Sequence, residues 1–223
     1  MSVKRLYYIA LQRVYTFFQR KRSNDKKAYM IHKISEEQDI YSISKKNFLK
    51  LIEIHENEFI TIEELVKGTK GIVLTFDDAF DSVYYLAHPV LKDKGIPYYI
   101  FICNEFINKQ GYLSKKMIHE ILSYEKCYLG SHSYYHKLSR EMSKEAFRES
   151  LEKSKLELER DFSRTINYYA FPYGSLYACS NINVKEAKNL FDYIFTTIPI
   201  PYCVDDHKVI PRFNINDKFT VKD

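Results

Sequence analysis

Short apolar runs alternate with amphipathic segments along almost the whole chain, and this alternation restricts the fold more than any other feature. Runs such as GIVLTF at 71–76 and IPYYIFI at 96–102 have the length and the aliphatic and aromatic content of buried strands. Segments such as 45–56 and 115–125 instead repeat apolar residues every three or four positions, as helices do. Strands that alternate with helices predict parallel βαβ units, and enough strands recur here for a barrel.

The composition is that of a globular protein with one main domain. The chain has 223 residues, of which 45% are hydrophobic and 28% charged, so it can bury a sizeable core. Its 34 Lys and Arg against 29 Asp and Glu leave a net charge of +5, and the basic residues are spread along the sequence except at 20–22 and 26–27. We therefore expect no nucleic-acid binding, which needs a concentrated basic face. The cysteines form no CxxC pair, so we expect buried, reduced thiols at Cys103, Cys127, Cys179 and Cys203.

Residues 1–27 predict a basic amphipathic helix followed by a polar linker, and residues 28–223 the main domain. Apolar residues from Leu6 to Phe18 recur at helical spacing, with basic residues between and after them. Two interpretations stay open: the helix packs on the domain, or residues 1–22 lie on an anionic membrane surface. No run reaches the about 20 apolar residues that span a bilayer, and no signal-peptide cleavage site is evident. We expect a cytoplasmic protein, with peripheral contact at the inner face of the membrane as the open alternative.

The run GIVLTF stops at two adjacent carboxylates, Asp77 and Asp78. In parallel α/β folds, functional groups gather at the edge where the strands end, and the pair lies at such an end. One carboxylate could also cap the next helix while the other is solvated, so the pair alone does not identify a site.

Two histidines, His132 and His136, follow another apolar run, CYLG at 127–130. On a helical turn, imidazoles four residues apart face the same side and can share one metal ion. Two histidines and one aspartate leave coordination positions open for water and substrate, and a second carboxylate can take the proton from that water. A third stretch, FPYG at 171–174, indicates a tight turn whose backbone N–H can stabilise an oxyanion.

Taken together, TFDD at 75–78, HSYYH at 132–136 and FPYG at 171–174 resemble the motifs of the polysaccharide deacetylase family, the NodB-homology carbohydrate esterases. The resemblance implies a distorted (β/α)7 barrel that removes acetyl groups from N-acetylated amino sugars with a divalent metal. It also implies that the metal ligands are Asp78, His132 and His136. Asp77 would then be the general base, and the backbone amide of Tyr173 the oxyanion donor.

The sequence departs from the family pattern at two places. Many members carry an arginine just before the PYG turn and a late Leu-x-His motif that supplies the general acid, and this chain has neither. His32 ends an early apolar strand, which resembles the rearranged deacetylases that act on poly-N-acetylglucosamine. Because a closed barrel joins its first and last strands, we predict His32 as the general acid, with His207 as the alternative. Arg212, in the last strand, is the predicted partner that orients Asp77.

The remaining expectations concern the metal and the substrate. A mixed nitrogen and oxygen ligand set suits Zn²⁺ and also Co²⁺, Ni²⁺ or Mn²⁺. The substrate would be an N-acetylated sugar in a polysaccharide, an oligosaccharide or a lipid- or nucleotide-linked precursor. A deformylase of a lipid-linked aminosugar and a catalytically decayed sugar-binding module are the alternatives; the oligomeric state is left open. Candidate substrate contacts are Tyr134, Tyr135, Phe171 and Pro172.

Overall fold

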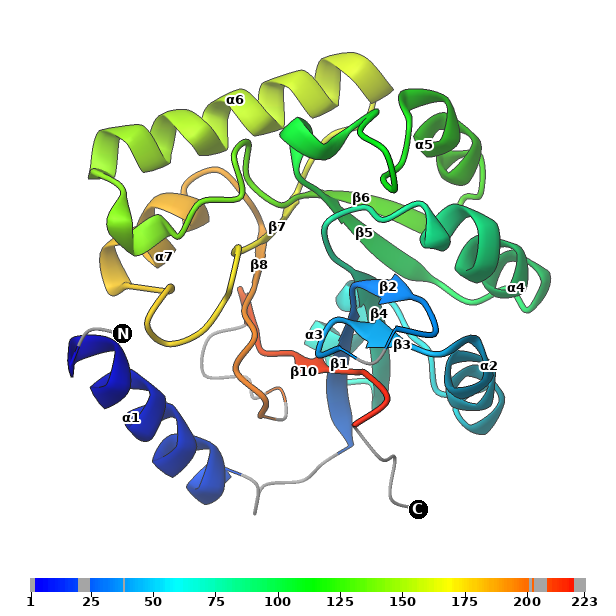
Figure 1. The fold of residues 1–223 in the computed structure, drawn as a ribbon, viewed down its shortest axis with the longest axis horizontal. Coiled ribbons are helices and arrows are strands. Elements are labelled where there is room, and N and C mark those ends of the chain that lie inside the picture. The colour runs from blue at the N-terminus through cyan, green and yellow to red at the C-terminus, as the bar shows by residue number, and fades with distance from the viewer. Residues whose placement is uncertain (1–2, 20–24, 38, 201, 203–207, 219–223) are drawn as a thin grey trace.

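In a computed structural model, the protein is a parallel β-sheet curled into a barrel with helices around its outside (Figure 1). The structure describes residues 3–19, 25–37, 39–200, 202 and 208–218. Across these residues the sheet has eight strands: β1 (Lys26–Ile31), β4 (Gly71–Phe76), β5 (Tyr98–Ile102), β6 (Cys127–Ser131), β7 (Tyr168–Ala170), β8 (Tyr193–Phe195), β9 (Val209–Ile210) and β10 (Phe213–Asn214). Their order is β10-β1-β4-β5-β6-β7-β8-β9, and every neighbouring pair is parallel.

The last two strands close the barrel. β9 and β10 are two halves of one segment, separated by Pro211 and Arg212. β9 pairs with β8, and β10 pairs with β1, so this segment connects the two edges of the sheet. Proline has no N–H to donate to a sheet ladder, which accounts for the break between the halves. Counted as one strand, the segment occupies the seventh position, and the predicted distorted (β/α)7 barrel is confirmed.

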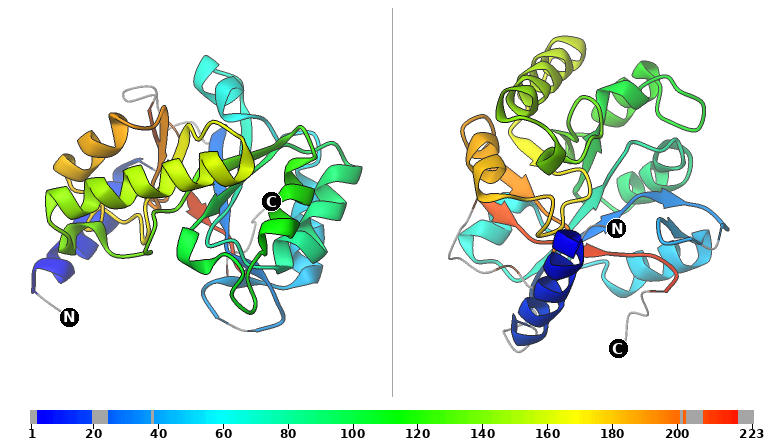
Figure 2. Two further views of the ribbon diagram at one scale, coloured as in Figure 1. Left: turned by 90° about the horizontal axis from the view of Figure 1, so that it is seen from above. Right: turned by 60° about the vertical axis from the view of Figure 1, so that its left-hand side comes forward.

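Helices surround the sheet: most of them cover its outer face, whereas α1 stands at the margin of the molecule (Figures 1 and 2). They are α1 (Val3–Gln19), α2 (Lys45–Ile54), α3 (Ile62–Lys67), α4 (His88–Asp93), α5 (Lys115–Leu122), α6 (Lys144–Phe162) and α7 (Asn181–Lys188). Five of them begin after a serine or threonine whose hydroxyl accepts a hydrogen bond from an amide of the first turn, which satisfies one free N–H. These capping residues are Ser44, Thr61, Ser114, Ser143 and Ser180.

Some elements differ from the sequence prediction. The amphipathic pattern of residues 81–95 predicts one helix, but the segment begins with a π-helical turn, Val83–Ala87, that continues into α4. The short α3 and a small separate sheet, β2 (Lys33–Ile34) with β3 (Ser42–Ile43), were not predicted. Elements of two to six residues are too short to display a hydrophobic period. β1 begins at Lys26, so the last two residues of the expected linker belong to the first strand.

The core consists of two clusters on the two sides of the sheet. Residues of β4 alternate between them: Leu74 and Phe76 pack among the helices, whereas Val73 joins Phe101 and Phe195 in the barrel interior. Every residue of β4 and β5 is buried, as expected for parallel strands covered on both faces. Thr75 and Asp77 follow Val73 at spacings of two, so they continue the interior face of the sheet.

Two further expectations can be compared with the described residues. Cys103 and Cys127 are buried free thiols, as predicted; Cys179 is also free but half-buried, and Cys203 lies outside the described residues. Within the described part of the chain, no helix combines the length and the apolar character needed to cross a membrane.

Candidate active site

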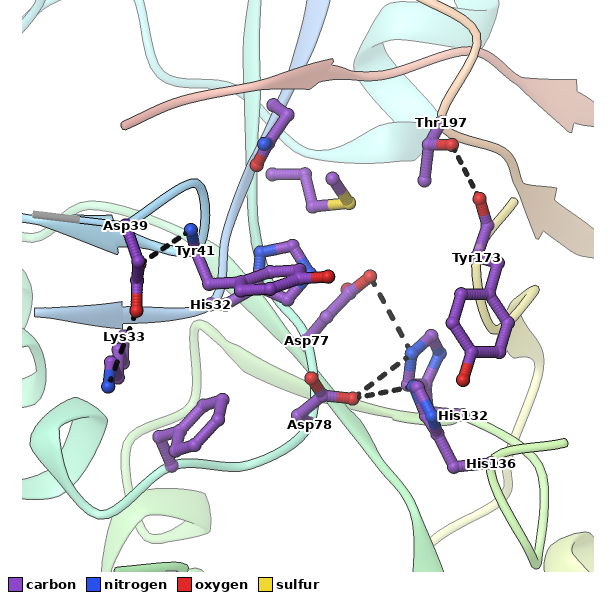
Figure 3. A pocket seen from close by; sticks show the side chains of 13 residues that line it. His32, Lys33, Asp39, Tyr41, Asp77, Asp78, His132, His136, Tyr173 and Thr197 are labelled. Atoms are coloured by element: carbon purple, nitrogen blue, oxygen red, sulfur yellow. Dashed lines mark hydrogen bonds and ion pairs between the residues drawn. The ribbon is translucent and has the colours of Figure 1, made fainter. Parts of the chain in front are cut away.

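A cavity of about 430 Å³ lies at the carboxyl ends of the barrel strands (Figure 3). Parallel strands all end at this edge, so loops that are far apart in sequence meet there. The cavity brings together six residues predicted from the sequence, which are His32, Asp77, Asp78, His132, His136 and Tyr173.

Asp77 and Asp78 reach the cavity together because the backbone turns sharply between β4 and the next loop. Successive residues of a strand point to opposite faces, so two adjacent carboxylates would ordinarily diverge. Asp78 and Ala79 have φ values of 66° and 64°, in the left-handed region that non-glycine residues rarely adopt. Asp77 is still tied to the sheet, since its amide donates to the Ile31 carbonyl at 2.9 Å.

Arg212 holds the Asp77 carboxylate with two hydrogen bonds. Nη1 donates to Oδ1 at 2.6 Å, and Nη2 donates to Oδ2 at 2.7 Å. The guanidinium also donates to Thr75 Oγ1 and to the Thr196 carbonyl. Arg212 is 0% exposed, so this is a buried ion pair with the planar, two-pronged geometry that lysine cannot reproduce.

The surroundings of Asp77 keep it ionised. Burial by itself raises the pKa of this carboxyl group, but the Arg212 guanidinium and His132 lower it by more, and the net shift is downward. At neutral pH Asp77 is therefore a fixed, oriented carboxylate.

The two histidines lie in a loop after β6, not on the helical turn that the sequence predicted. Ser133 and His136 adopt left-handed φ values of 64° and 50°, and the hydroxyl groups of Ser131 and Ser133 accept hydrogen bonds from backbone amides of the loop. This compact turn brings the two imidazoles together with ring centroids 4.9 Å apart. The expected convergence is present, but a serine-stabilised turn produces it in place of helical periodicity.

Asp78, His132 and His136 offer three ligand atoms that lie within 4.8 Å of one another. Asp78 Oδ1 is 3.0 Å from His136 Nε2 and 3.4 Å from His132 Nε2. Ligands that are each about 2.0–2.2 Å from one zinc ion lie roughly 3–4 Å apart, so the set fits such an ion. His132 Nδ1 lies 2.9 Å from the Ala170 carbonyl oxygen, which can accept a hydrogen bond from an Nδ1–H group. In that tautomer the lone pair of Nε2 faces the site.

Asp78 is ionised in this group. Burial raises the pKa of its carboxyl group, and the facing histidines lower it to a value below the ordinary range. A carboxylate held in this form suits coordination of a cation.

His32 follows β1 directly and lines the cavity from the side opposite the histidine pair (Figure 3). Its ring packs edge-on against Tyr41 at 5.2 Å, and its Nδ1 is buried without a hydrogen-bond partner among the described residues. Burial lowers the pKa of the imidazole, and the nearby carboxylates offset this only in part. The alternative acid, His207, lies outside the described residues.

Tyr173 occupies the tight turn expected from FPYG. Its φ is 63°, and Thr197 fixes the turn by donating from Oγ1 to the Tyr173 carbonyl and from its amide to the Gly174 carbonyl. No described residue accepts a hydrogen bond from the Tyr173 amide. The Tyr173 ring lies 5.2 Å from that of His136 and is 53% exposed, at the border of the cavity.

The four candidate substrate contacts do not line the cavity. Tyr134 and Tyr135 pack against Lys153 of α6, whose Nζ is 3.7 Å from the Tyr134 ring centroid. Phe171 is fully buried, with its ring stacked on a core phenylalanine, and Pro172 is also buried. All four side chains therefore pack against α6 or in the core, away from the cavity.

Several cavity residues were not predicted. They come from the small β2–β3 sheet and from loops, and include Lys33, Asp39, Tyr41, Phe80 and Thr197. Lys33 and Tyr41 follow His32 closely in the sequence, and this proximity is the one signal that could have indicated them.

Comparison with known proteins identifies the family that has this fold and this site. The polysaccharide deacetylase family model matches residues 65–191, more than half of the chain, and the chain belongs to this family. The predicted family and enzyme class, hydrolases of a linear amide C–N bond, are thereby confirmed.

Particular relatives cover most of the chain. The poly-β-1,6-N-acetyl-D-glucosamine N-deacetylase of Staphylococcus aureus is 24% identical over an alignment of 200 positions, which covers 79% of this chain and 69% of that protein. IcaB from Ammonifex degensii has a similar structure, with a TM-score of 0.74 at 20% identity over 88% of this chain and 94% of the other. The Streptococcus pyogenes deacetylase PplD has a TM-score of 0.75 at 18% identity, over 85% of this chain and 92% of the other.

Proposed function

We propose that the protein removes N-acetyl groups from a polymer of N-acetylglucosamine, with poly-β-1,6-N-acetylglucosamine as the first candidate. One observation carries the proposal: a carboxylate fixed by Arg212 stands in the same cavity as a three-ligand group that fits a metal ion. The Staphylococcus relatives, named as deacetylases of this polymer, support the choice of substrate.

Asp78, His132 and His136 would hold the divalent ion, for which zinc is our first choice. When bound, such an ion supplies Lewis acidity that polarises the acetyl carbonyl and makes water a better nucleophile. The remaining steps belong to side chains and amides of the chain.

Asp77 acts as the general base, because it is ionised, oriented by Arg212 and open to the cavity. It takes a proton from the water that attacks the acetyl carbon. The Tyr173 amide donates to the oxygen that becomes negative. His32, whose lowered pKa keeps it neutral at rest, takes over the proton that Asp77 removed from the water and passes it to the departing nitrogen. The C–N bond then breaks, and a free amine and acetate leave.

The two alternatives from the sequence are not favoured. Removal of formyl would use the same groups, but the relatives are named as N-deacetylases. A decayed sugar-binding module would not be expected to keep an ion-paired base beside a complete ligand set.

The deciding experiment compares wild type with Asp77→Asn on β-1,6-linked N-acetylglucosamine oligomers with added Zn²⁺. We expect wild type to release acetate, and mass spectrometry to find one acetyl replaced by hydrogen per sugar attacked. Asp77→Asn should lose about 100-fold to 10,000-fold in rate, the usual contribution of a general base, while metal content stays normal.

The same assay is run on β-1,4-linked oligomers and on an N-formylated analogue as comparison substrates. Release of formate in preference to acetate would favour the deformylase. Oligomer binding without release, under any of the four metals, would leave the sugar-binding module as the better description.

A further inference from the structure

The N-terminal helix α1 contacts the barrel through a narrow polar side. Gln12 Oε1 accepts a hydrogen bond from the Leu176 amide at 3.1 Å, and Tyr8 OH accepts one from Arg140 at 3.3 Å. The Arg140 guanidinium also lies 4.4 Å from the Tyr8 ring centroid. In Figures 1 and 2 the helix stands at the margin of the molecule, with one of its long sides free.

The apolar side of α1 faces away from the barrel. Leu6, Tyr7, Leu11 and Val14 are 49%, 63%, 41% and 54% exposed. Their spacings place them on one face, about opposite to the contacting Tyr8 and Gln12. An ordinary surface helix buries its apolar stripe against the core. In α1 the apolar stripe is instead exposed, and the packing of the helix on the domain leaves it uncovered.

The charge of this segment identifies what can cover the stripe. Residues 1–24 contain six basic side chains and no Asp or Glu, and the first acidic residue is Asp25. The basic residues are Lys4, Arg5, Arg13, Arg20, Lys21 and Arg22. Two copies of the chain that paired through this face would bring like charges together, whereas an anionic lipid surface neutralises them. Apolar side chains on one face with flanking Lys and Arg are the composition of helices that lie in a membrane interface.

We propose that α1 binds anionic lipid bilayers through the face that carries Leu6, Tyr7, Leu11 and Val14. The helix docks beside the cavity, because Leu176 lies just after the Tyr173 turn and Arg140 just after the His136 loop. The helix that binds the bilayer therefore lies next to the loops that border the cavity, with its lipid-binding face on the far side. This inference concerns binding and does not depend on the proposed reaction.

The test is co-sedimentation of the full chain with vesicles of phosphatidylcholine alone or mixed with phosphatidylglycerol. We expect binding to the anionic vesicles, weakened by salt, and at least about tenfold less binding to the neutral ones. Leu6→Glu/Val14→Glu should lower binding to anionic vesicles by at least about tenfold, because it places two carboxylates in the apolar face. Leu156→Glu on α6, where the leucine is 68% exposed, is the matched control and should bind like wild type.

Circular dichroism and acetate release from short oligomers check that both variants are folded. Three results would overturn the proposal: wild type that stays in the supernatant, full binding by the double variant, or equal loss in the Leu156→Glu control. A dimer that the double variant abolishes, without vesicle binding by wild type, would identify the face as a contact between copies and would also overturn it.

Discussion

Two adjacent residues, Asp77 and Asp78, have the same side chain but different surroundings. Both oxygens of Asp77 accept from Arg212, while one oxygen of Asp78 faces the two imidazoles. Burial raises the pKa of both groups, but Arg212 and His132 lower the pKa of Asp77 by more, and the two histidines lower that of Asp78 by more. Both carboxylates are thus charged, but only Asp78 lies in a position to share an ion with the histidines.

Arg212→Lys is the sharpest test of the pairing with Asp77. A single ammonium cannot replace the two parallel hydrogen bonds, so we expect kcat to fall by about 100-fold from misorientation of the base. The guanidinium lowers the pKa of Asp77, so weaker pairing raises that pKa. Because Asp77 acts as the anion, the acidic limb of the pH–rate profile should move to higher pH.

The control is Arg148→Lys, at an exposed arginine on α6. A merely structural Arg212 would lower the amount of folded enzyme without moving the acidic limb. An unchanged pH–rate profile in Arg212→Lys would therefore remove Arg212 from the positioning role.

His32→Gln tests the proposed acid. The variant keeps a polar side chain but cannot carry the proton, so kcat should fall by about 100-fold to 10,000-fold at unchanged metal content. A substrate with a better leaving group should recover much of the loss, because it needs less protonation. His119→Gln, at an exposed histidine on α5, should keep wild-type activity. Full activity in His32→Gln would point to an acid outside the described residues, such as His207.

At the scale of elements, the site is built by loops with unusual backbone conformations. Left-handed φ values occur at Asp78, Ala79, Ser133, His136 and Tyr173, in the three loops that carry the motifs. Non-glycine residues pay roughly 1–2 kcal/mol for this conformation, so the surrounding contacts must enforce it. Regular strands bring the chain to the barrel edge, and these strained turns aim the functional groups into the cavity.

Gly174→Ala tests whether the Tyr173 turn needs its present shape. Gly174 has φ of 40°, and a Cβ there would lie 2.6 Å from the amide nitrogen of Thr197. The turn must shift, so we expect kcat to fall by about 100-fold as the Tyr173 amide leaves its position.

Gly111→Ala is the matched control for backbone strain. Gly111 also has a left-handed φ, 82°, but no atom lies within 4 Å of an added Cβ. It should cost stability and leave kcat unchanged. Equal effects of the two substitutions on kcat would mean that the Tyr173 turn has no special part in catalysis.

At the scale of the whole molecule, barrel closure joins residues from both ends of the domain. β10 pairs with β1, so Arg212 binds Asp77 in the same cavity that His32 lines, although Arg212 and His32 are 180 positions apart in the sequence. The proposed metal ligands likewise come from loops after two different strands, β4 and β6. A bound ion would therefore link separate parts of the barrel and stabilise the folded state over the unfolded one.

Metal binding should raise the melting temperature. Zn²⁺ at about 100 times its Kd should add about 2.7 kcal/mol to the free energy of unfolding. For a domain of this size, that corresponds to a rise of about 5–10 °C in melting temperature. A chelator should reverse the shift. The Asp78→Asn variant should show no such Zn²⁺-induced shift in melting temperature. Asp93→Asn, at an exposed aspartate, should show the full shift. A shift that survives Asp78→Asn would place the ion elsewhere.

The sequence by itself determined the barrel class and six of the residues that line the cavity. Buried parallel strands read as uniform apolar runs, and residues such as Asp77 and His132 stand where those runs stop. It also indicated Arg212 as the partner of Asp77, because a closed barrel makes its first and last strands neighbours.

Only the tertiary structure decided how those groups are aimed. The histidine pair converges through a serine-stabilised turn, and Phe171 is buried in the core; hydrophobic periodicity indicates neither arrangement. The same holds for α1: its periodicity predicted an amphipathic helix, but which side faces the barrel depended on Arg140 and Leu176. Local pattern fixes which residues share a face, whereas long-range packing decides where that face points.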